Sequence, residues 1–425
     1  MKAIRSLIGP LSVALACLAG CGSGSGSGGS GGSPATGGTS ATGGAPATGG
    51  TPGTGGGSGG SGLAGTTSTG GATGTGGVAG TGGAAGTGGT SGSSGATGGT
   101  SGPPALTVNG NKLQDPTGKT IVLRGASLID IGSLYAGANN SASGITARID
   151  KVIAAGVQGD VVRLPVYPKI DYNGGYPYCS AVPYPVGTGP SASCTVTAPL
   201  SASDYDSKVL KPAVDYATSK GLYVIIDHHQ IDNATSGTSA ADATTFWTDV
   251  APQYAGYSNV LYEPFNEPID GSANWATLKP VVQGWINLIR AAAPNNIIIV
   301  PSTSYDQHPG DAASNPPTGT NLMYTAHVYP GNWNSTFMSQ LATATSKVPV
   351  FISEWGYTVV TSGTSVDDTT SATWGSDFQT VVDGDGASWT AWVTDNGWTP
   401  SMFKDGGLTQ LTDFGTLVKN WQAAH

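Results

Sequence analysis

The chain has 425 residues, and its 26 acidic and 17 basic residues give a formal net charge of −9 at pH 7. Lys2 and Arg5 are the only charged residues before residue 105, so the 15 remaining basic residues face all 26 acidic ones, and residues 105–425 carry −11. This balance argues against nucleic acids and anionic polymers as partners. No stretch after the N-terminal region is apolar and long enough to span a bilayer.

Residues 1–21 have the pattern of a lipoprotein signal peptide. Lys2 and Arg5 precede the short apolar run LIGPLSVALACLAG. The segment LAGC, residues 18–21, resembles a lipobox, in which the cysteine is lipidated and becomes the new N-terminus. We therefore expect export, with Cys21 as the lipidation site of a cell-surface lipoprotein in the outer membrane or envelope. Membrane contact would then run only through the lipid on Cys21, and a secreted form is the alternative.

Residues 22–104 consist almost entirely of Gly, Ser, Thr and Ala with a few Pro, and they include no charged side chain. This composition offers too little apolar surface to offset the entropy lost on ordering the backbone, which predicts a disordered segment. We interpret it as a tether between a lipid anchor and the folded part.

The cysteines indicate one disulfide. Cys17 lies in the signal and Cys21 at its end, which leaves Cys179 and Cys194 as a pair in an exported chain. A disulfide is expected there rather than a metal site, because no further cysteine completes one. Closing so short a loop would stabilise the fold by about 3 kcal/mol.

Strand and helix patterns alternate through residues 105–425. A hairpin over residues 108–119 is expected to close the bottom of the fold. The β-rich runs are 120–128, 159–166, 222–229, 259–268, 296–301, 321–330, 348–356 and 387–393. The helical patterns are 144–157, 201–221, 240–256, 275–294, 336–345, a helix from about residue 371, and 411–424. In the helix 201–221, Ser203 is the expected N-cap and Gly221 the expected stop.

Eight mostly apolar strands, most of them followed by a helix, predict an α/β fold of the closed (β/α)₈ TIM barrel type. The length of about 320 residues is usual for one such barrel. An open Rossmann-type sheet is the alternative, but no G-x-G-x-x-G follows the first strand.

In such a barrel the active site lies at the carboxyl-terminal ends of the strands. The polar or aromatic residues that end the apolar runs are Arg163, Asp227, His228, His229, Asn266, Glu267, His327, Tyr329, Glu354, Trp355 and Trp392. Glu267 closes the fourth strand and Glu354 the seventh, on opposite sides of the barrel mouth. A facing carboxyl pair is what cleavage of a glycosidic bond requires, with one acid for the leaving oxygen and one anion for the anomeric carbon.

Six motifs occur in register on these strands: RLPV, DHH, FNEP, AHVY, ISEWG and TAWV. In this order they resemble glycoside hydrolase family 5, the cellulase-type retaining β-glycanases, over nearly all of the folded part. The resemblance implies that Glu267 is the acid/base, Glu354 the nucleophile, and Asn266 the partner of the sugar 2-hydroxyl. It implies that Arg163 keeps the nucleophile ionised. It also assigns residues around the two acids and under the sugar: His229, His327, Tyr329 and Trp392.

The two histidines His228 and His229 point to opposite faces of one strand, so at most one should face the cleft squarely. The position of His228 is often Trp in related sequences, which leaves open which histidine faces the cleft. Asp227 shares the parity of His229 and either orients a histidine or contacts substrate. Aromatic residues that either stack on sugars or pack internally are Tyr305, Trp333, Trp355 and Trp398.

Glu263 lies four residues before Glu267 along the same run. At roughly 3.3 Å per residue it sits about 13 Å deeper in the barrel, so we expect a structural role. A buried carboxylate needs a partner, and Arg124 of the first strand is the candidate. Glu267, among apolar neighbours, is expected to have a pKa raised towards neutrality.

The sequence therefore predicts a retaining endo-β-1,4-glycanase, first of all an endoglucanase acting as a monomer on a neutral β-linked polysaccharide. An endo-β-mannanase or another β-glycanase is the nearest alternative. No cofactor is implied. A metal-dependent hydrolase using Asp227, His228, His229 and His327 is disfavoured, because adjacent histidines on one strand chelate poorly and no H-x-H ends the first strand. A non-catalytic polysaccharide-binding protein would not need both Glu267 and Glu354.

Overall fold

The computed structural model describes residues 102–167, 200–270 and 274–425. The chain divides into the units Met1–Gly89 and Thr90–His425, and the described residues all belong to the second. The expected signal peptide, nearly all of the tether and the Cys179 and Cys194 pair lie outside them. Among the described residues, no helix combines the length and the hydropathy that crossing a membrane requires.

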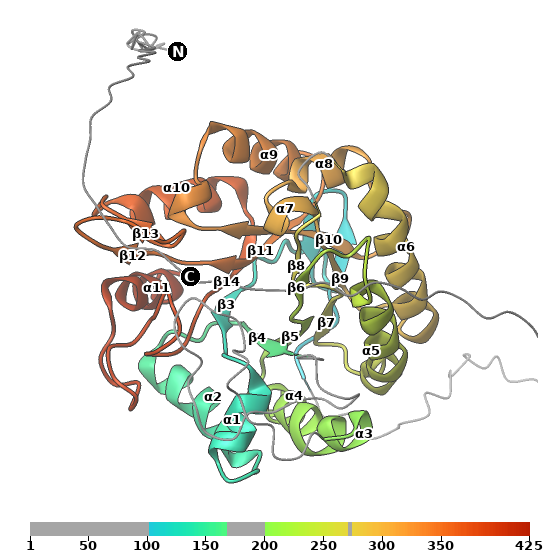
Figure 1. The fold of residues 1–425 in the computed structure, drawn as a ribbon, viewed down its shortest axis with the longest axis horizontal. Coiled ribbons are helices and arrows are strands. Elements are labelled where there is room, and N and C mark those ends of the chain that lie inside the picture. Colours follow the sequence, from blue (N-terminus) through green and yellow to red (C-terminus); the bar gives the residue numbers. More distant parts are fainter. Residues whose placement is uncertain (1–101, 168–199, 271–273) are drawn as a thin grey trace, which may run out of the picture. The chain divides into compact units, whose positions relative to one another are not determined.

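Eight parallel strands form a closed barrel in the middle of the molecule (Figure 1). They are β3 (Arg124–Ser127), β4 (Val161–Val166), β5 (Tyr223–His228), β7 (Val260–Glu263), β9 (Ile298–Val300), β10 (Leu322–Val328), β11 (Val350–Trp355) and β14 (Ser388–Ala391). They pair in chain order, and β14 pairs with β3 to close the ring. The predicted (β/α)₈ barrel is confirmed, with one barrel strand inside each of the eight β-rich runs.

Helices surround the barrel and cover the outer faces of its strands (Figure 1). They are α1 (Ile131–Gly137), α2 (Ser143–Ala155), α3 (Ala202–Tyr205), the π-helical turn η1 (Asp206–Leu210), α4 (Lys211–Ser219), α5 (Ser239–Tyr254), α6 (Trp275–Ala292), α7 (Thr303–Asp306), α8 (Pro309–Ser314), the 3₁₀ turn η2 (Pro330–Asn332), α9 (Ser335–Thr345), α10 (Trp374–Asp385) and α11 (Asp413–Ala423). Because both faces of each barrel strand are covered, the strands are apolar without alternation.

Alternate residues of most barrel strands belong to two different apolar cores. On β4, Val162 and Leu164 pack outward against the helices, whereas Val161 packs inward with the lower barrel core. That inner core includes Leu106 and Leu113, which flank and belong to the hairpin of β1 (Thr107–Asn109) and β2 (Lys112–Gln114). The hairpin therefore closes the amino-terminal end of the barrel, as the sequence predicts, and polar inward residues remain for the other end.

The helical run 202–219 begins earlier than expected. The side chain of Ser201 accepts a hydrogen bond from the backbone N–H of Asp204 at 3.1 Å, so Ser201 is the N-cap and the expectation of Ser203 was wrong. Gly221 follows the last turn with φ of +78°, which suits the predicted stop. A helix N-cap needs an extended backbone, and the extended residue here is Ser201 (φ −64°, ψ 160°).

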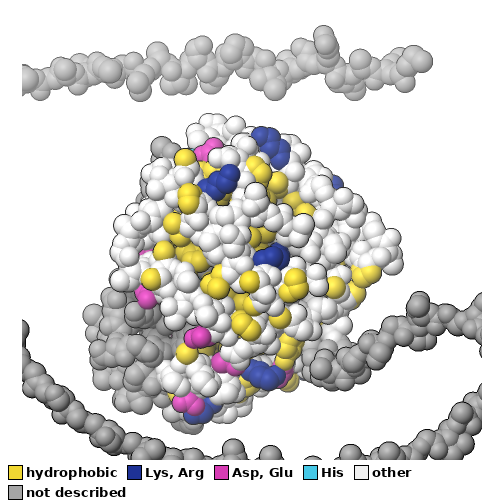
Figure 2. Space-filling view, turned by 90° about the vertical axis from the view of Figure 1, so that its right-hand side faces the viewer, with side chains coloured by type: hydrophobic (Ala, Val, Ile, Leu, Met, Phe, Trp, Pro, Cys, Tyr) yellow, Lys and Arg dark blue, Asp and Glu magenta, His cyan; other side chains and the backbone are white. Residues whose placement is uncertain are grey.

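Two small two-stranded sheets follow the carboxyl-terminal ends of barrel strands. One pairs β6 (Ile231–Asp232) with β8 (Glu267–Pro268), and the other pairs β12 (Thr358–Val359) with β13 (Asp368–Thr369). On the face shown in Figure 2, acidic and basic side chains are few and scattered, and the basic ones do not gather into a patch.

Candidate active site

The polar residues that point into the upper barrel come from strands on all sides of it. Arg163 lies on β4, Asp227 on β5, Glu263 on β7 and His327 on β10. Each has the inward parity of the lower-core residue two or four positions before it, such as Val161 before Arg163 and Met323 before His327. The alternation that buries apolar side chains at the bottom therefore brings charged ones together at the top.

Glu354 reaches this group through an irregularity in β11. Phe351 pairs with Thr325 of β10, whereas Glu354 pairs with His327. Over this interval β11 therefore contains one residue more than β10. Such a bulge interrupts the alternation of side chains. Phe351 points inward and Ile352 outward, and without the extra residue Glu354 would share the outward side of Ile352. The bulge turns Glu354 towards the barrel mouth.

Glu267 is fixed by the short β6–β8 sheet. Its backbone N–H donates to the carbonyl of Gln230 at 3.0 Å, and the N–H of Asn266 donates to the carbonyl of His228 at 3.0 Å. Pro268 completes β8 and disfavours a helical conformation at Glu267. The acid is thus held on paired backbone.

Arg163 contacts four polar side chains of the site. Its side chain is fully buried, and Nε donates to Glu263 Oε2 at 2.6 Å while Nη1 donates to Glu354 Oε1 at 2.7 Å. Nη2 donates to Asn266 Oδ1 at 2.6 Å and lies 2.9 Å from Asp227 Oδ2. Burial alone would lower the pKa of Arg163, but the carboxylates of Asp227, Glu263 and Glu354 outweigh burial and raise it well above its ordinary value. The guanidinium therefore remains charged.

The partner of Glu263 is Arg163, so the expected pair with Arg124 was wrong. Arg124 lies 3.5 Å from Asp383 near the surface instead. Arg124 begins β3 at the lower end of the barrel, while Arg163 shares the upper layer with Glu263. The predicted burial of Glu263 is confirmed, since the residue is 0% exposed.

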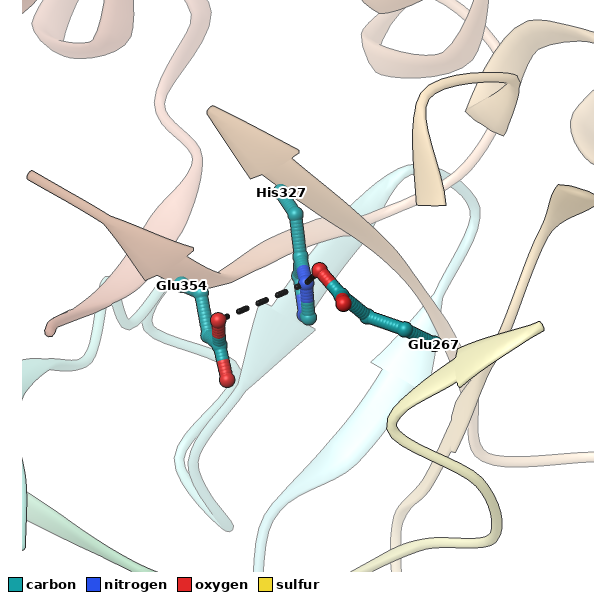
Figure 3. Close-up of side chains that lie close together, drawn as sticks. All are labelled: Glu267, His327 and Glu354. Atoms are coloured by element: carbon teal, nitrogen blue, oxygen red, sulfur yellow. Dashed lines mark hydrogen bonds and ion pairs between the residues drawn. The ribbon is translucent and has the colours of Figure 1, made fainter. Parts of the chain in front are cut away.

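Glu267 and Glu354 converge on His327 (Figure 3). One oxygen of each glutamate and one ring nitrogen of His327 all lie within 4.8 Å of one another. His327 Nδ1 is 2.7 Å from Glu267 Oε1 and 3.6 Å from Glu354 Oε2. The two glutamates retain 9% and 5% exposure, whereas Asp227 and Glu263 have none, so the converging pair is the one that an incoming molecule can reach.

The two carboxyl groups have unlike surroundings. Glu354 accepts hydrogen bonds from Arg163 at 2.7 Å and from the hydroxyl of Tyr329 at 2.8 Å, a pattern that suits an anion. In the part of the chain that the structure describes, Glu267 has no such cationic partner at hydrogen-bonding distance. Burial raises its pKa from 4.5 to about 7, although His229 and Arg163 act in the opposite direction. One group is arranged as a carboxylate and the other as an acid.

His229, not His228, lies beside the glutamates. His229 Nδ1 is 2.6 Å from Asp227 Oδ2 and 4.0 Å from Glu354 Oε1. His228 points the other way, between Phe246 and Phe265, and neither of its ring nitrogens has a hydrogen-bond partner on another described residue. Burial lowers the pKa of both imidazoles to about 3, so both are neutral. The sequence left open which histidine faces the cleft, and the structure places His229 there and His228 in the outer core.

The aromatic candidates divide into two groups. Trp392 stacks on His229 with ring centroids 5.2 Å apart and also contacts Trp398, so both belong to the barrel mouth. Trp355 and Trp333 pack instead against the helix residue Phe378. These two tryptophans belong to the outer core.

Asp306 is a buried acid that sequence reasoning missed. It has 0% exposure, and its Oδ2 lies 3.7 Å from His327 Nε2. It ends the short helix α7, six residues after β9. The only signal in the sequence is an acidic residue shortly after a strand end, and the expected elements include no helix at this point.

Among the described residues, one group has the composition and spacing to suggest a metal site: Glu267, His327 and Glu354. The 2.7 Å contact between His327 and Glu267 is a hydrogen-bond distance. Two ligands on one ion at about 2.0 to 2.2 Å in tetrahedral geometry lie roughly 3.4 Å apart. As they stand, the three side chains are arranged as a hydrogen-bonded acid group.

Comparisons with known proteins agree with this geometry. Residues 115–397 match the family model described as cellulase (glycosyl hydrolase family 5). An endoglucanase of Clostridium saccharobutylicum is 34% identical over 236 residues, which cover 53% of this chain and 50% of that protein. Endoglucanase A of Evansella cellulosilytica is 35% identical over 154 residues, covering 36% and 32%. The solved β-glucanase SdGluc5_26A of Saccharophagus degradans, in complex with cellotetraose, superposes with a TM-score of 0.60 at 23% identity and covers 76% of this chain and 94% of that one.

The chain spans about half, or less, of the length of these curated relatives. The solved β-glucanase structure shows a similar fold. The family match covers more than half of the chain and contains every residue of the site, from Arg163 to Trp392. The chain belongs to the cellulase family, glycosyl hydrolase family 5.

Proposed function

We propose that the chain is a retaining endo-β-1,4-glucanase with Glu354 as nucleophile and Glu267 as acid/base. The observation that carries the proposal is the pair itself, with one oxygen of each carboxyl group within 4.8 Å of the other and with unlike partners. Retaining enzymes hold their two carboxyl groups about 5 to 5.5 Å apart, and inverting enzymes about 6.5 to 9.5 Å. The short separation favours double displacement.

In the first step, Glu354 attacks the anomeric carbon while Glu267 gives its proton to the leaving oxygen, which yields a glycosyl ester on Glu354. In the second step, Glu267 takes a proton from water, the water oxygen bonds to the anomeric carbon, and Glu354 leaves as a carboxylate. Arg163 and Tyr329 orient the Glu354 carboxylate and stabilise its charge before attack and after release.

β-1,4-Glucan is the proposed substrate. Its support is the family match, the endoglucanase names of the relatives and the cellotetraose bound to the similar β-glucanase. β-Mannan is the nearest alternative, because glucose and mannose differ only at the 2-hydroxyl. Trp392, beside His229 at the barrel mouth, is the proposed platform beneath the sugar.

Hydrolysis of a panel of polysaccharides tests the proposal. Carboxymethylcellulose, β-mannan, xylan, xyloglucan and mixed-linkage glucan are compared, with product sizes and with the first-formed anomer followed by NMR. We expect fastest cleavage of β-1,4-glucan into mixed oligosaccharides, with the β anomer appearing first. Faster cleavage of mannan would reassign the substrate, and the α anomer appearing first would exclude double displacement. The control Glu354→Ala should be inactive, and wild-type rates in this variant would overturn the mechanism.

We also propose that the protein is exported and anchored by a lipid on Cys21, with residues 22–104 as a tether, and that Cys179 and Cys194 form a disulfide. The support is the LAGC segment, the uncharged Gly-rich composition and the pairing of the remaining cysteines. Cys21→Ala should move the enzyme from the membrane fraction to the soluble fraction. Thiol labelling of unfolded, unreduced protein should leave Cys179 and Cys194 unmodified, and light scattering should report a monomer.

A further inference from the structure

Asp306 has an unusual backbone. Ser304, Tyr305 and Asp306 have φ angles of 59°, 59° and 56°, three consecutive non-glycine residues in the left-handed region. This conformation costs roughly 1 to 2 kcal/mol for each such residue. Strain of this kind persists only where the surrounding structure imposes it, and it is found most often at functional sites.

The side chain of Asp306 is buried and half satisfied. Oδ1 accepts a hydrogen bond from the backbone N–H of Ser302 at 2.5 Å. Oδ2 has no hydrogen-bond partner among the described residues, and His327 Nε2, at 3.7 Å, is the base that it faces. An unsatisfied buried carboxyl oxygen is costly, so its retention beside a catalytic pair calls for a role.

His327 connects Asp306 to the acid/base glutamate. Its Nδ1 is 2.7 Å from Glu267 Oε1, on the opposite side of the ring from Nε2. Nε2 also lies 3.1 Å from Ser353 Oγ. A serine hydroxyl can donate or accept, so this contact does not determine which ring nitrogen carries the proton. The carboxyl group of Asp306 can determine it.

We propose, on the basis of the function proposed above, that Asp306 is a positioning residue that acts through His327 on Glu267. In the resting enzyme the Asp306 carboxyl group is protonated and faces Nε2, which keeps the ring proton on Nδ1, where it donates to Glu267. When Glu267 gives its own proton to the leaving oxygen, the proton of Asp306 moves to Nε2. An imidazolium then stands beside the new Glu267 carboxylate, and both protons return when Glu267 accepts one from water.

The surroundings of both groups agree with this assignment. Burial raises the pKa of Asp306 well above its ordinary value, and the acidic groups Glu263, Glu267 and Glu354 raise it further. Burial lowers the pKa of His327 to about 4, which makes it neutral in the resting state. The charged groups that act on His327 are Glu354, Arg163, Glu263 and His229, besides its contacts with Glu267 and Asp306. Both directions favour a proton on Asp306 and a neutral imidazole on His327 in the resting state, as the proposal requires.

Asp306→Asn tests the proposal, because an amide keeps the size of the carboxyl group that faces Nε2 but cannot release a proton. Asparagine also tolerates a left-handed backbone. For cellotetraose, whose leaving group needs protonation, kcat/KM should fall about tenfold. For 2,4-dinitrophenyl β-cellobioside, whose leaving group needs no proton, it should change less than about twofold. The alkaline limb of kcat/KM for cellotetraose should move to higher pH, because the Glu267 carboxylate has lost its imidazolium.

Asp270→Asn is the matched control. This buried carboxylate accepts hydrogen bonds from the backbone of Ala234 and Thr235 and takes no part in the acid group. The Asp270→Asn substitution should lower Tm, and any change in kcat/KM should be the same for the two substrates. An equal loss on both substrates in Asp306→Asn, an unmoved alkaline limb, or a limb moved to lower pH would overturn the proposal.

NMR of the His327 ring in the wild-type enzyme gives a second test that needs no variant. The proposal requires the Nδ1-protonated tautomer near neutral pH, and the Nε2-protonated tautomer would contradict it. Wild-type activity on cellotetraose and on 2,4-dinitrophenyl β-cellobioside is measured in parallel. Its absence would refute the proposed function, whereas the tautomer reports on Asp306 independently.

Discussion

At the scale of single residues, Arg163 explains how so many acids share one site. The chain contains three glutamates, and all three lie here: Glu263 and Glu354 at the guanidinium and Glu267 beside His327. One buried cation cannot neutralise all the acids around it. Glu267 has no cation at hydrogen-bonding distance among the described residues, so its carboxyl group tends to keep a proton, which is the state that a general acid needs.

Glu263→Gln should destabilise the fold by about 1 to 3 kcal/mol, because a buried charged partner of Arg163 becomes a neutral one. Turnover of the folded fraction should remain near that of the wild type, since Arg163 still contacts Glu354, Asn266 and Asp227. Chemical denaturation and kcat on β-glucan measure the two effects separately. Loss of turnover in a fully folded variant would mean that Glu263 has a catalytic role.

Arg124→Gln is the comparison variant. Its ion pair with Asp383 is long, at 3.5 Å, and partly exposed. We expect this substitution to change the free energy of unfolding by less than about 1 kcal/mol. A loss as large as that of Glu263→Gln would contradict the assignment of Glu263 to Arg163.

At the scale of elements, the bulge in β11 is what brings the second glutamate to the site. The sequence predicts that Glu354 closes a strand, but period-two alternation from Phe351 would point it outward. One extra residue is invisible in the pattern VPVFISEWG, because a bulge depends on pairing with β10. The position of Glu354 at a strand end, together with the resemblance to a known family, therefore carried its assignment, and periodicity did not.

The helical run from α3 to α4 gives a test of cap placement. Ser201→Ala removes the acceptor for the N–H of Asp204 and should destabilise the fold by about 1 kcal/mol. Ser203→Ala, two positions into the helix, should change stability by less than about 0.5 kcal/mol. Thermal denaturation of the two variants decides between the caps. A larger loss in Ser203→Ala would reverse the assignment.

Most strand-end candidates could be predicted because strand parity and the barrel rule act locally. The burial of Glu263 and the inward direction of His229 follow from such parity. The partner of Glu263 could not be predicted in this way, because the choice between Arg124 and Arg163 depends on which layer of the barrel each occupies. Asp306 escaped prediction because its position depends on a left-handed turn, which non-glycine residues rarely adopt and which no local pattern announces.

At the scale of the whole molecule, the site is assembled at the expense of stability. Burial raises the pKa of Glu267 to about 7, so the folded state binds a proton there more tightly than the unfolded chain, whose group has its ordinary pKa of 4.5. The resulting stabilisation is complete below pH 4.5 and is lost as the pH rises through 7. The wild-type enzyme therefore carries a penalty at neutral pH that a neutral side chain would not.

Glu267→Gln should remove this penalty. The free energy of unfolding of the variant, relative to the wild type, should increase by roughly 1.4 kcal/mol per pH unit between pH 4.5 and 7 and level off above pH 7. Urea denaturation at several pH values measures the difference. A constant difference across this range would contradict the raised pKa of Glu267.

Azide rescue distinguishes Glu354 as the nucleophile from Glu267 as the acid/base. With 2,4-dinitrophenyl β-cellobioside, Glu354→Ala leaves room for azide on the face opposite the leaving group and should give the α-glycosyl azide. Glu267→Ala still forms the ester on Glu354, and azide should displace that ester to give the β-glycosyl azide. NMR distinguishes the two products. The account predicts opposite anomers from the two variants, and the same anomer from both, or the reverse assignment, would contradict it.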